Sequence, residues 1–151
     1  MLIGARYWIL CDKPRASLLM SPHDGRGWRP GRDEVDNRPW IPVSMQSHNG
    51  VYAAKSVEDL RAALVTEEAR ACLRGRWWES ELREYEPRAV VLGHVQIWGK
   101  VVEHERGYRA EHARICSIDE IAYGPQLENL QSGGHDLRVL RLIYGVGARG
   151  Q

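Results

Sequence analysis

Residues 88–118 read RAVVLGHVQIWGKVVEHERGYRAEHARICSI, and this stretch decides the fold. The run from Val90 to Val102, rich in β-branched and apolar residues, is the strongest strand signal in the chain. Tyr108 to Ile115 has the composition of a second strand, and Arg106-Gly107 between the two predicts a hairpin turn. The stretch therefore predicts two long antiparallel strands at the centre of a sheet.

Two glycines inside the first of these strands predict curvature. Gly93 and Gly99 allow another backbone to approach closely or the strand to bend sharply. The chain has 151 residues, which fits one domain with its own core. We therefore predict a single α+β domain over residues 1–151, built on a strongly curved, mostly antiparallel β-sheet with one or two helices.

The other elements follow from local patterns. Ser56 precedes an acidic first turn, as at the start of a capped helix. Clusters of Gly, Pro, Asp and Asn mark turns and loops. Strands are expected at 6–11, 17–20, 50–54 and 137–144, helices at 56–64 and 66–73, a helix or turn at 77–82, a long irregular loop at 22–49, turns at 123–125 and 132–135, and a frayed tail at 145–151.

The charges of this chain indicate binding of an anionic ligand only at local clusters, and not through the net charge. The formal net charge is +1, so no global field attracts nucleic acid or a membrane. Arginines interleaved with tryptophans are typical of surfaces that stack bases or contact phosphate, although a solvated face has the same composition. Two such groups are Arg26, Arg29, Arg32 and Arg38, and Arg70, Arg74 and Arg76.

The three cysteines, Cys11, Cys72 and Cys116, are far apart and form no C-x-x-C pair, which argues against a disulfide framework or a zinc ribbon. The first residues have no signal-peptide pattern, and no apolar run approaches the roughly 20 residues of a membrane span. We therefore expect a cytoplasmic protein. No Gly-rich phosphate loop or nucleophile elbow is recognisable either.

Two motifs resemble the signature of ASCH domains in the PUA-like superfamily. Residues 31–40, GRDEVDNRPW, are similar to the family segment G-x-K-x-x-E-x-R with its following Trp, and residues 50–56, GVYAAKS, to its R-G-x-x-x-I-H-A-x-K strand. Residues 86–93, EPRAVVLG, resemble the strand entry P-x-G-A-hydrophobic-hydrophobic-G. The resemblance covers roughly residues 25–105 and implies a PUA-like barrel.

This resemblance places Arg32 at the family's Lys position and Asp36 at its Glu position, after a one-residue insertion. These positions carry the amidohydrolase chemistry of hydrolytic members, but arginine stays protonated at neutral pH and cannot accept a proton. The resemblance thus favours binding of RNA, single-stranded nucleic acid or a (modified) nucleotide, without a cofactor, over catalysis. The expected cleft residues are Trp28, Arg32, Asp36, Arg38, Trp40 and Lys55, with Arg32 and Arg38 on phosphate or a base edge and Trp40 stacking.

The segment from Leu92 to Ala113 also resembles small uncharacterised bacterial proteins. Some of them carry additional Cys residues before the corresponding Gly-x-Tyr-Ala strand. Those Cys are absent here, so the resemblance implies no metal site.

An alternative of another class is an enzyme that consumes NAD. Tyr52 and Glu111 resemble the Tyr and Glu of an ADP-ribosyltransferase fold, in which the aromatic residue stacks on nicotinamide and the Glu orients the ribose. Arg6 would be the early basic residue of that site. A core Tyr and a surface Glu explain the same residues, and a third alternative is a protein-interaction domain with an exposed aromatic patch.

Three histidines, His94, His104 and His112, raise the hypothesis of a metal site, because neutral imidazole is a common zinc ligand. A two-residue turn at Arg106-Gly107 would place His104 opposite Arg109, and the three rings would then not need to converge. No metal is therefore expected.

The same hairpin predicts ion pairs among Glu103, Arg109 and Glu111 across the two strands. Facing opposite charges contribute roughly 0.2–1 kcal/mol each. The alternative is a solvated charged hairpin that keeps the edge of the sheet soluble.

Overall fold

The computed structural model describes residues 1–13, 16–21, 27–35, 40–64, 86–123 and 130–149. Within these ranges the chain forms seven strands and two helices. In order they are β1 (Leu2–Lys13), β2 (Ala16–Met20), β3 (Gly27–Trp28), β4 (Glu34–Val35), β5 (Val51–Ala54), α1 (Val57–Leu64), β6 (Glu86–Glu103), β7 (Gly107–Tyr123) and α3 (Leu130–Tyr144).

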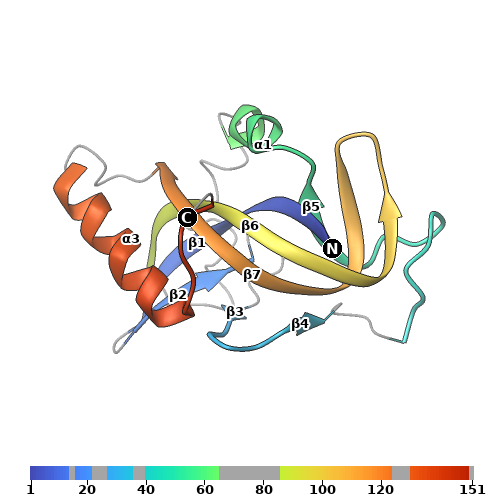
Figure 1. Ribbon diagram of the computed structural model, residues 1–151, viewed down its shortest axis with the longest axis horizontal. Coiled ribbons are helices and arrows are strands. Elements are labelled where there is room, and N and C mark those ends of the chain that lie inside the picture. Colours follow the sequence, from blue (N-terminus) through green and yellow to red (C-terminus); the bar gives the residue numbers. More distant parts are fainter. Residues whose placement is uncertain (14–15, 22–26, 36–39, 65–85, 124–129, 150–151) are drawn as a thin grey trace.

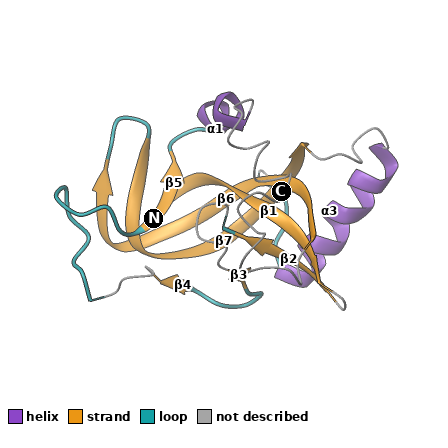
Figure 2. Cartoon of the chain, turned by 180° about the vertical axis from the view of Figure 1, so that it is seen from behind, coloured by secondary structure: helices purple, strands orange, loops and turns teal. Residues whose placement is uncertain are grey.

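Four of the strands close into a ring. β1 pairs with β6 along most of its length, and β6 pairs with β7. β7 pairs with β5, and Ala54 of β5 pairs back with Ala5 of β1. β2 and β3 extend the sheet from β1, and β4 lies on β7. These named pairs are all antiparallel, and Figures 1 and 2 show the resulting curved sheet. The predicted single α+β domain with a strongly curved, mostly antiparallel sheet is confirmed.

Gly93 and Gly99 produce the close approach and the bend that the sequence predicts. A Cβ atom on Gly93 would lie 2.2 Å from the Ser117 carbonyl oxygen and 3.0 Å from the Trp8 ring. Gly99 has a φ of 80°, in the left-handed region that glycine tolerates, and it lies where the β6–β7 register shifts. The two long strands can therefore lie close together at one point and bend at the other.

The core fills the inside of this ring. Among the described residues its largest fully buried side chain is Trp8 of β1, and its other members come from β1, β2, β3, β5, both long strands and α3. Leu140 and Tyr144 of α3 pack against this cluster, so the helix covers one opening of the ring. In both cartoon views α3 and the β6–β7 hairpin lie at opposite ends of the molecule.

The predictions for the first half of the chain hold for most elements. β1, β2 and β5 lie where the sequence predicts strands, and α1 begins after Ser56. The Asp59 amide donates to the Ser56 hydroxyl at 3.1 Å, which caps the helix. The expected irregular loop at 22–49 contains two short strands, β3 and β4. The expected helices at 66–73 and 77–82 lie outside the described residues.

The predicted strand at 137–144 and turn at 132–135 are wrong, because both belong to α3. Leu137, Leu140 and Tyr144 follow helical spacing and pack on the core, whereas the intervening Leu142 is 82% exposed. The apolar residues of this segment fit both a helical and an alternating pattern. Packing over the opening of the ring selects the helix.

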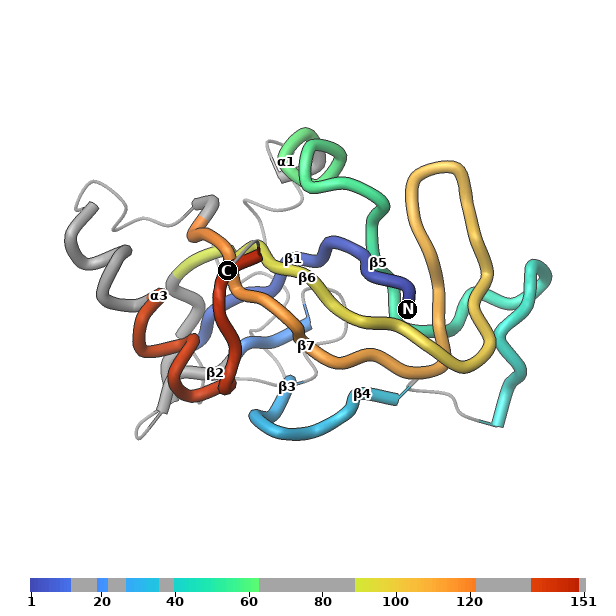
Figure 3. Tube along the Cα trace, in the orientation of Figure 1, coloured from blue at the N-terminus to red at the C-terminus, as the bar shows by residue number. Residues whose placement is uncertain are grey.

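Residues 145–149 follow α3 and make hydrogen bonds with β7, while the frayed tail at 145–151 stays a prediction. The Ile118 amide donates to the Gly147 carbonyl oxygen at 3.0 Å, and the Arg149 amide donates to Asp119 Oδ1 at 2.8 Å. Figure 3 shows this segment (red) beside β7. Backbone pairing with a long strand is what holds it in place.

The predicted hairpin register is also wrong. Glu103 pairs with Tyr108 and Val102 pairs with Arg109, so His104 does not lie opposite Arg109. The His104 amide donates to the Gly107 carbonyl oxygen at 2.8 Å, which centres the loop one residue earlier than the expected Arg106-Gly107 turn.

Among the described helices, none combines the length and the apolar character that a membrane crossing requires.

Candidate ligand-binding pocket

A pocket of about 290 Å³ lies between the β3–β4 connection, β7 and the C-terminal end of α3. Three segments that are far apart in the sequence thus form one cavity. It is lined by Trp28 of β3 with Arg29, Gly31 and Arg32 after it, by Arg114 and Ile115 of β7, and by Tyr144 of α3 with Gly145 and Val146 after it.

The β3–β4 connection places two arginines at the ends of one tight turn. The sequence is Arg29-Pro30-Gly31-Arg32, Gly31 has a φ of 72°, and the Arg32 amide donates to the Arg29 carbonyl oxygen. Proline followed by a glycine with positive φ is typical of a type II turn, which brings its first and last residues close together. Both arginines are exposed, and neither has a carboxylate partner in the described part of the chain.

The third arginine reaches the pocket from the sheet. Glu34 of β4 pairs with Ala113 of β7, and this register places Asp33 beside Arg114. The Asp33 carboxylate accepts a hydrogen bond from Arg114 Nε. Because both side chains of this pair are about half exposed, the ion pair contributes little to the stability of the fold. Its role is to orient the Arg114 side chain. Arg114 is therefore held in place, while most of its guanidinium donors remain free.

The floor of the pocket is aromatic and firmly fixed. The Trp28 indole N–H donates to the Ser21 hydroxyl at 2.7 Å, its ring lies 4.7 Å from the Arg6 guanidinium carbon, and it meets Trp8 edge to face. The Tyr144 hydroxyl donates to the Trp28 carbonyl oxygen and accepts from the Leu19 amide at 3.0 Å. Only 3% of Trp28 and 8% of Tyr144 is exposed.

Burial makes Tyr144 a dependable donor. The pKa of its hydroxyl is raised to about 12, mainly because burial removes the group from water. The hydrogen bond from the Leu19 amide lowers this pKa, and the nearby Glu34 carboxylate raises it. The phenol therefore stays protonated throughout the neutral range. Its hydrogen bond to β3 ties the end of α3 to the strand that carries Trp28.

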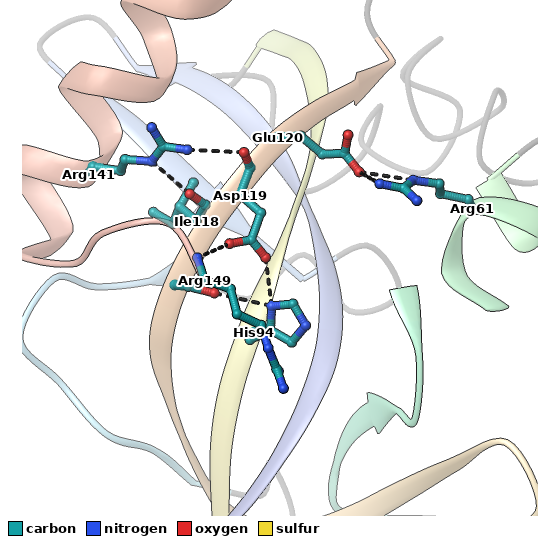
Figure 4. A network of polar contacts seen from close by, with 8 residues as sticks. Arg61, His94, Ile118, Asp119, Glu120, Arg141 and Arg149 are labelled. Carbon is teal, nitrogen blue, oxygen red and sulfur yellow. Dashed lines mark hydrogen bonds and ion pairs between the residues drawn. The ribbon is translucent and has the colours of Figure 1, made fainter. Parts of the chain in front are cut away.

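A second polar network holds residues 145–149, the segment whose first two residues line the pocket (Figure 4). The Arg141 guanidinium donates to the carbonyl oxygens of Ile118 and Asp119. The Asp119 carboxylate accepts from the Arg149 amide through Oδ1 and contacts His94 Nδ1 at 2.6 Å through Oδ2. Because an ionised carboxylate only accepts, Nδ1 carries the proton in this geometry. The network thus fixes the C-terminal segment against β7.

The structure brings two of the six predicted ligand residues together in the pocket, Trp28 and Arg32. Trp40 is 75% exposed and is not among the lining residues. Lys55 forms an ion pair with Glu103 at 2.6 Å, and this carboxylate raises the pKa of the ammonium group. Asp36 and Arg38 lie outside the described residues.

The residues of the alternative NAD site are distributed as follows. Arg6 Nη1 donates to the Tyr52 carbonyl oxygen, and its Nη2 donates to Ser21 inside the sheet. The Tyr52 side chain is 48% exposed. The Glu111 carboxylate accepts the Lys100 amide at 2.6 Å, and no hydrogen bond joins it to Arg6 or Tyr52 within the described ranges.

The three histidines of the metal hypothesis have separate environments. His94 bonds to Asp119, His104 accepts from Arg109, and the His112 ring stacks on Trp98 with centroids 5.6 Å apart. The described residues contain no group of three or more His, Cys, Asp or Glu side chains that could hold a metal ion.

The predicted ion pairs among Glu103, Arg109 and Glu111 are wrong, and so is the solvated alternative for Arg109. Only 9% of Arg109 is exposed. Its guanidinium donates at 2.7 Å to each of the Ser44 and Asn49 carbonyl oxygens and at 3.0 Å to His104 Nε2. The segment 44–49 covers this side chain, and its backbone supplies acceptors in place of carboxylates.

Arg29, Arg114 and Tyr144 line the pocket but are not among the cleft residues expected from the sequence, although Arg29 belongs to the first arginine–tryptophan group. The Arg-Pro-Gly-Arg pattern was a usable signal for Arg29, since it predicts a type II turn with an arginine at each end. The other two depend on the pairing of β4 with β7 and on the helix at the C-terminus, which no local pattern reveals.

Comparisons of this chain with models of known protein families, with curated proteins and with solved structures give no match.

Proposed function

We propose that the protein binds a nucleotide or single-stranded nucleic acid in the pocket between the Arg29–Arg32 turn, β7 and the end of α3. The observation that carries this proposal is the convergence of Arg29, Arg32 and Arg114 on one cavity with an apolar floor. Guanidinium groups bind phosphate oxygens in a bidentate way and are weakly hydrated, which suits them to this role.

The surroundings support an anionic ligand. Arg29 and Arg32 have no carboxylate partner among the described residues, so their charge is available to a ligand. The net charge of the chain is only +1, and attraction must come from a local group such as this one. Binding alone explains these features, and we assign no catalytic step to the pocket.

The proposal keeps the ligand class expected from the ASCH resemblance but changes the residues. Trp28 and Arg32 remain, Arg29 and Arg114 join them, and Trp40 is not required for the site. The PUA-like assignment itself is part of the proposal, and the curved antiparallel sheet supports it.

A filter-binding series tests this function with a short RNA, a single-stranded DNA of the same sequence, and nucleotides as competitors. We expect the affinity to fall steeply between about 50 mM and about 200 mM salt, because contacts to phosphate release counterions. The double variant Arg29→Ala/Arg32→Ala should lose at least about tenfold in affinity, equivalent to about 1.4 kcal/mol.

The matched control is Lys100→Ala/Arg106→Ala, which removes two exposed cations of the β6–β7 hairpin that do not line the pocket. Its affinity should stay near that of the unchanged protein. Equal losses in both double variants would show a non-specific charge effect. No salt-sensitive binding to any of the ligands would refute the proposed function.

A further inference from the structure

We infer that the pocket recognises a terminal phosphate group, as on a free nucleotide or at the 5′ end of a strand, and not the internal backbone or the base of a nucleic acid. This inference rests on the proposed function and narrows its ligand to a compact phosphate-bearing anion. It follows from which donors in the pocket are free, which rings are accessible, and how large the cavity is.

The aromatic residues of the floor cannot serve as a stacking platform. Proteins that bind single strands stack successive bases on open aromatic faces along a basic groove. Here the Arg6 guanidinium occupies a face of Trp28, and the two floor rings are 3% and 8% exposed. Trp28 and Tyr144 are thus too deeply buried to offer a base an open ring face.

The polar atoms of the same rings are not free to identify a base. The indole N–H of Trp28 is bonded to Ser21, and the hydroxyl of Tyr144 is bonded to the Trp28 carbonyl oxygen and to the Leu19 amide. Reading a base edge requires donors and acceptors that match it. The free side-chain donors that line this pocket belong to the three arginines, and these match an anion.

The distribution of arginines favours one compact group over an extended strand. Arg29 and Arg32 lie at the two ends of one turn, and Arg114 approaches from β7. Two other described arginines are already occupied by protein groups, Arg109 by the carbonyls of residues 44 and 49 and Arg141 by those of residues 118 and 119.

The size and charge of the pocket agree with this ligand. A volume of about 290 Å³ lies at the lower end for small-ligand sites, so it suits a single nucleotide unit better than a run of several. A terminal phosphate carries more negative charge than a backbone phosphodiester and presents three oxygens to guanidinium groups. Both properties favour the end of a strand or a free nucleotide over the strand interior.

Isothermal titration at low salt tests the inference with adenosine, its 5′-monophosphate and its 5′-diphosphate, and with one 12-nucleotide strand carrying either a 5′-phosphate or a 5′-hydroxyl. The mono- and diphosphate should bind at least about tenfold more tightly than adenosine, and removal of the 5′-phosphate should weaken strand binding at least about tenfold. Arg32→Ala should abolish these preferences, whereas Arg106→Ala should retain them. Circular dichroism establishes that both variants are folded.

The arms of the experiment separate the possible results. Binding of the monophosphate without binding of the phosphorylated strand would identify a free nucleotide as the ligand, and binding of both would include strand ends. Equal, salt-sensitive binding of the two strands would overturn the inference and leave the proposed function standing. Absence of binding to every ligand would overturn both.

Discussion

Replacing Arg109 by alanine is expected to lower the free energy of unfolding by about 3 kcal/mol or more, because hydrogen bonds to charged groups contribute about 1.5–3 kcal/mol each and their loss leaves partners unsatisfied. The side chain is 9% exposed and holds the Ser44 and Asn49 carbonyl oxygens and His104 Nε2. Its removal should also release the segment 44–49 from β7. Urea unfolding followed by tryptophan fluorescence measures the change.

Arg106→Ala is the matched control, since it removes the same side chain from an exposed position of the same hairpin. Surface substitutions of this kind change stability by less than about 0.5 kcal/mol. If the two variants unfolded at the same urea concentration, Arg109 would not be the link between the hairpin and the segment that covers it.

Gly93→Ala is expected to destabilise the protein by about 3 kcal/mol, at the upper end for overpacking in a core. The new Cβ would lie 2.2 Å from the Ser117 carbonyl oxygen and 3.2 Å from the Ile118 Cα atom. These are backbone atoms of the neighbouring strand, so they cannot move aside as the end of a flexible side chain can. β6 and β7 would have to separate at this point.

Gly27→Ala provides the comparison, because it is also a glycine within a strand. Among the described residues its Cβ would meet only the Met20 side chain, 3.4 Å away, and its φ is not positive. We expect a change of less than about 1 kcal/mol there, since alanine also lowers the entropy of the unfolded chain. Thermal unfolding of the two variants side by side gives the answer. A Gly93→Ala protein as stable as Gly27→Ala would contradict the close approach of the two strands.

The parts of the fold that could be predicted are those that local patterns determine. The strands near Trp8 and Val95, the helix after Ser56 and the curvature at Gly93 all follow from composition, caps and glycine positions. α3 could not be assigned because Leu137 to Tyr144 fits two periods, and only its contact with the core decides between them. The prediction of the hairpin register was wrong because local composition does not determine it. One backbone hydrogen bond, from the His104 amide to the Gly107 carbonyl oxygen, sets the register.

Some residues of the candidate site could be predicted from local sequence, and others could not. Trp28 and Arg32 were accessible to sequence reasoning because arginine and tryptophan lie together in one segment. Arg114 and Tyr144 join them through the β4–β7 register and the packing of α3, which are long-range features. Arg109 shows the opposite case: its charge suggested ion pairs, whereas burial under residues 44–49 gave it backbone acceptors.

The most direct test of the pocket as the binding site is a two-dimensional ¹⁵N NMR titration with adenosine 5′-monophosphate. Saturable shifts should concentrate on the Trp28 indole N–H and on the amides of Gly31, Arg32, Arg114 and Gly145, which line the cavity. The amides of Lys100 and Arg106 in the distant hairpin should not move. Shifts gathered around Trp40 and Lys55 instead, or no saturable shift at all, would contradict the assignment of this pocket as the ligand site.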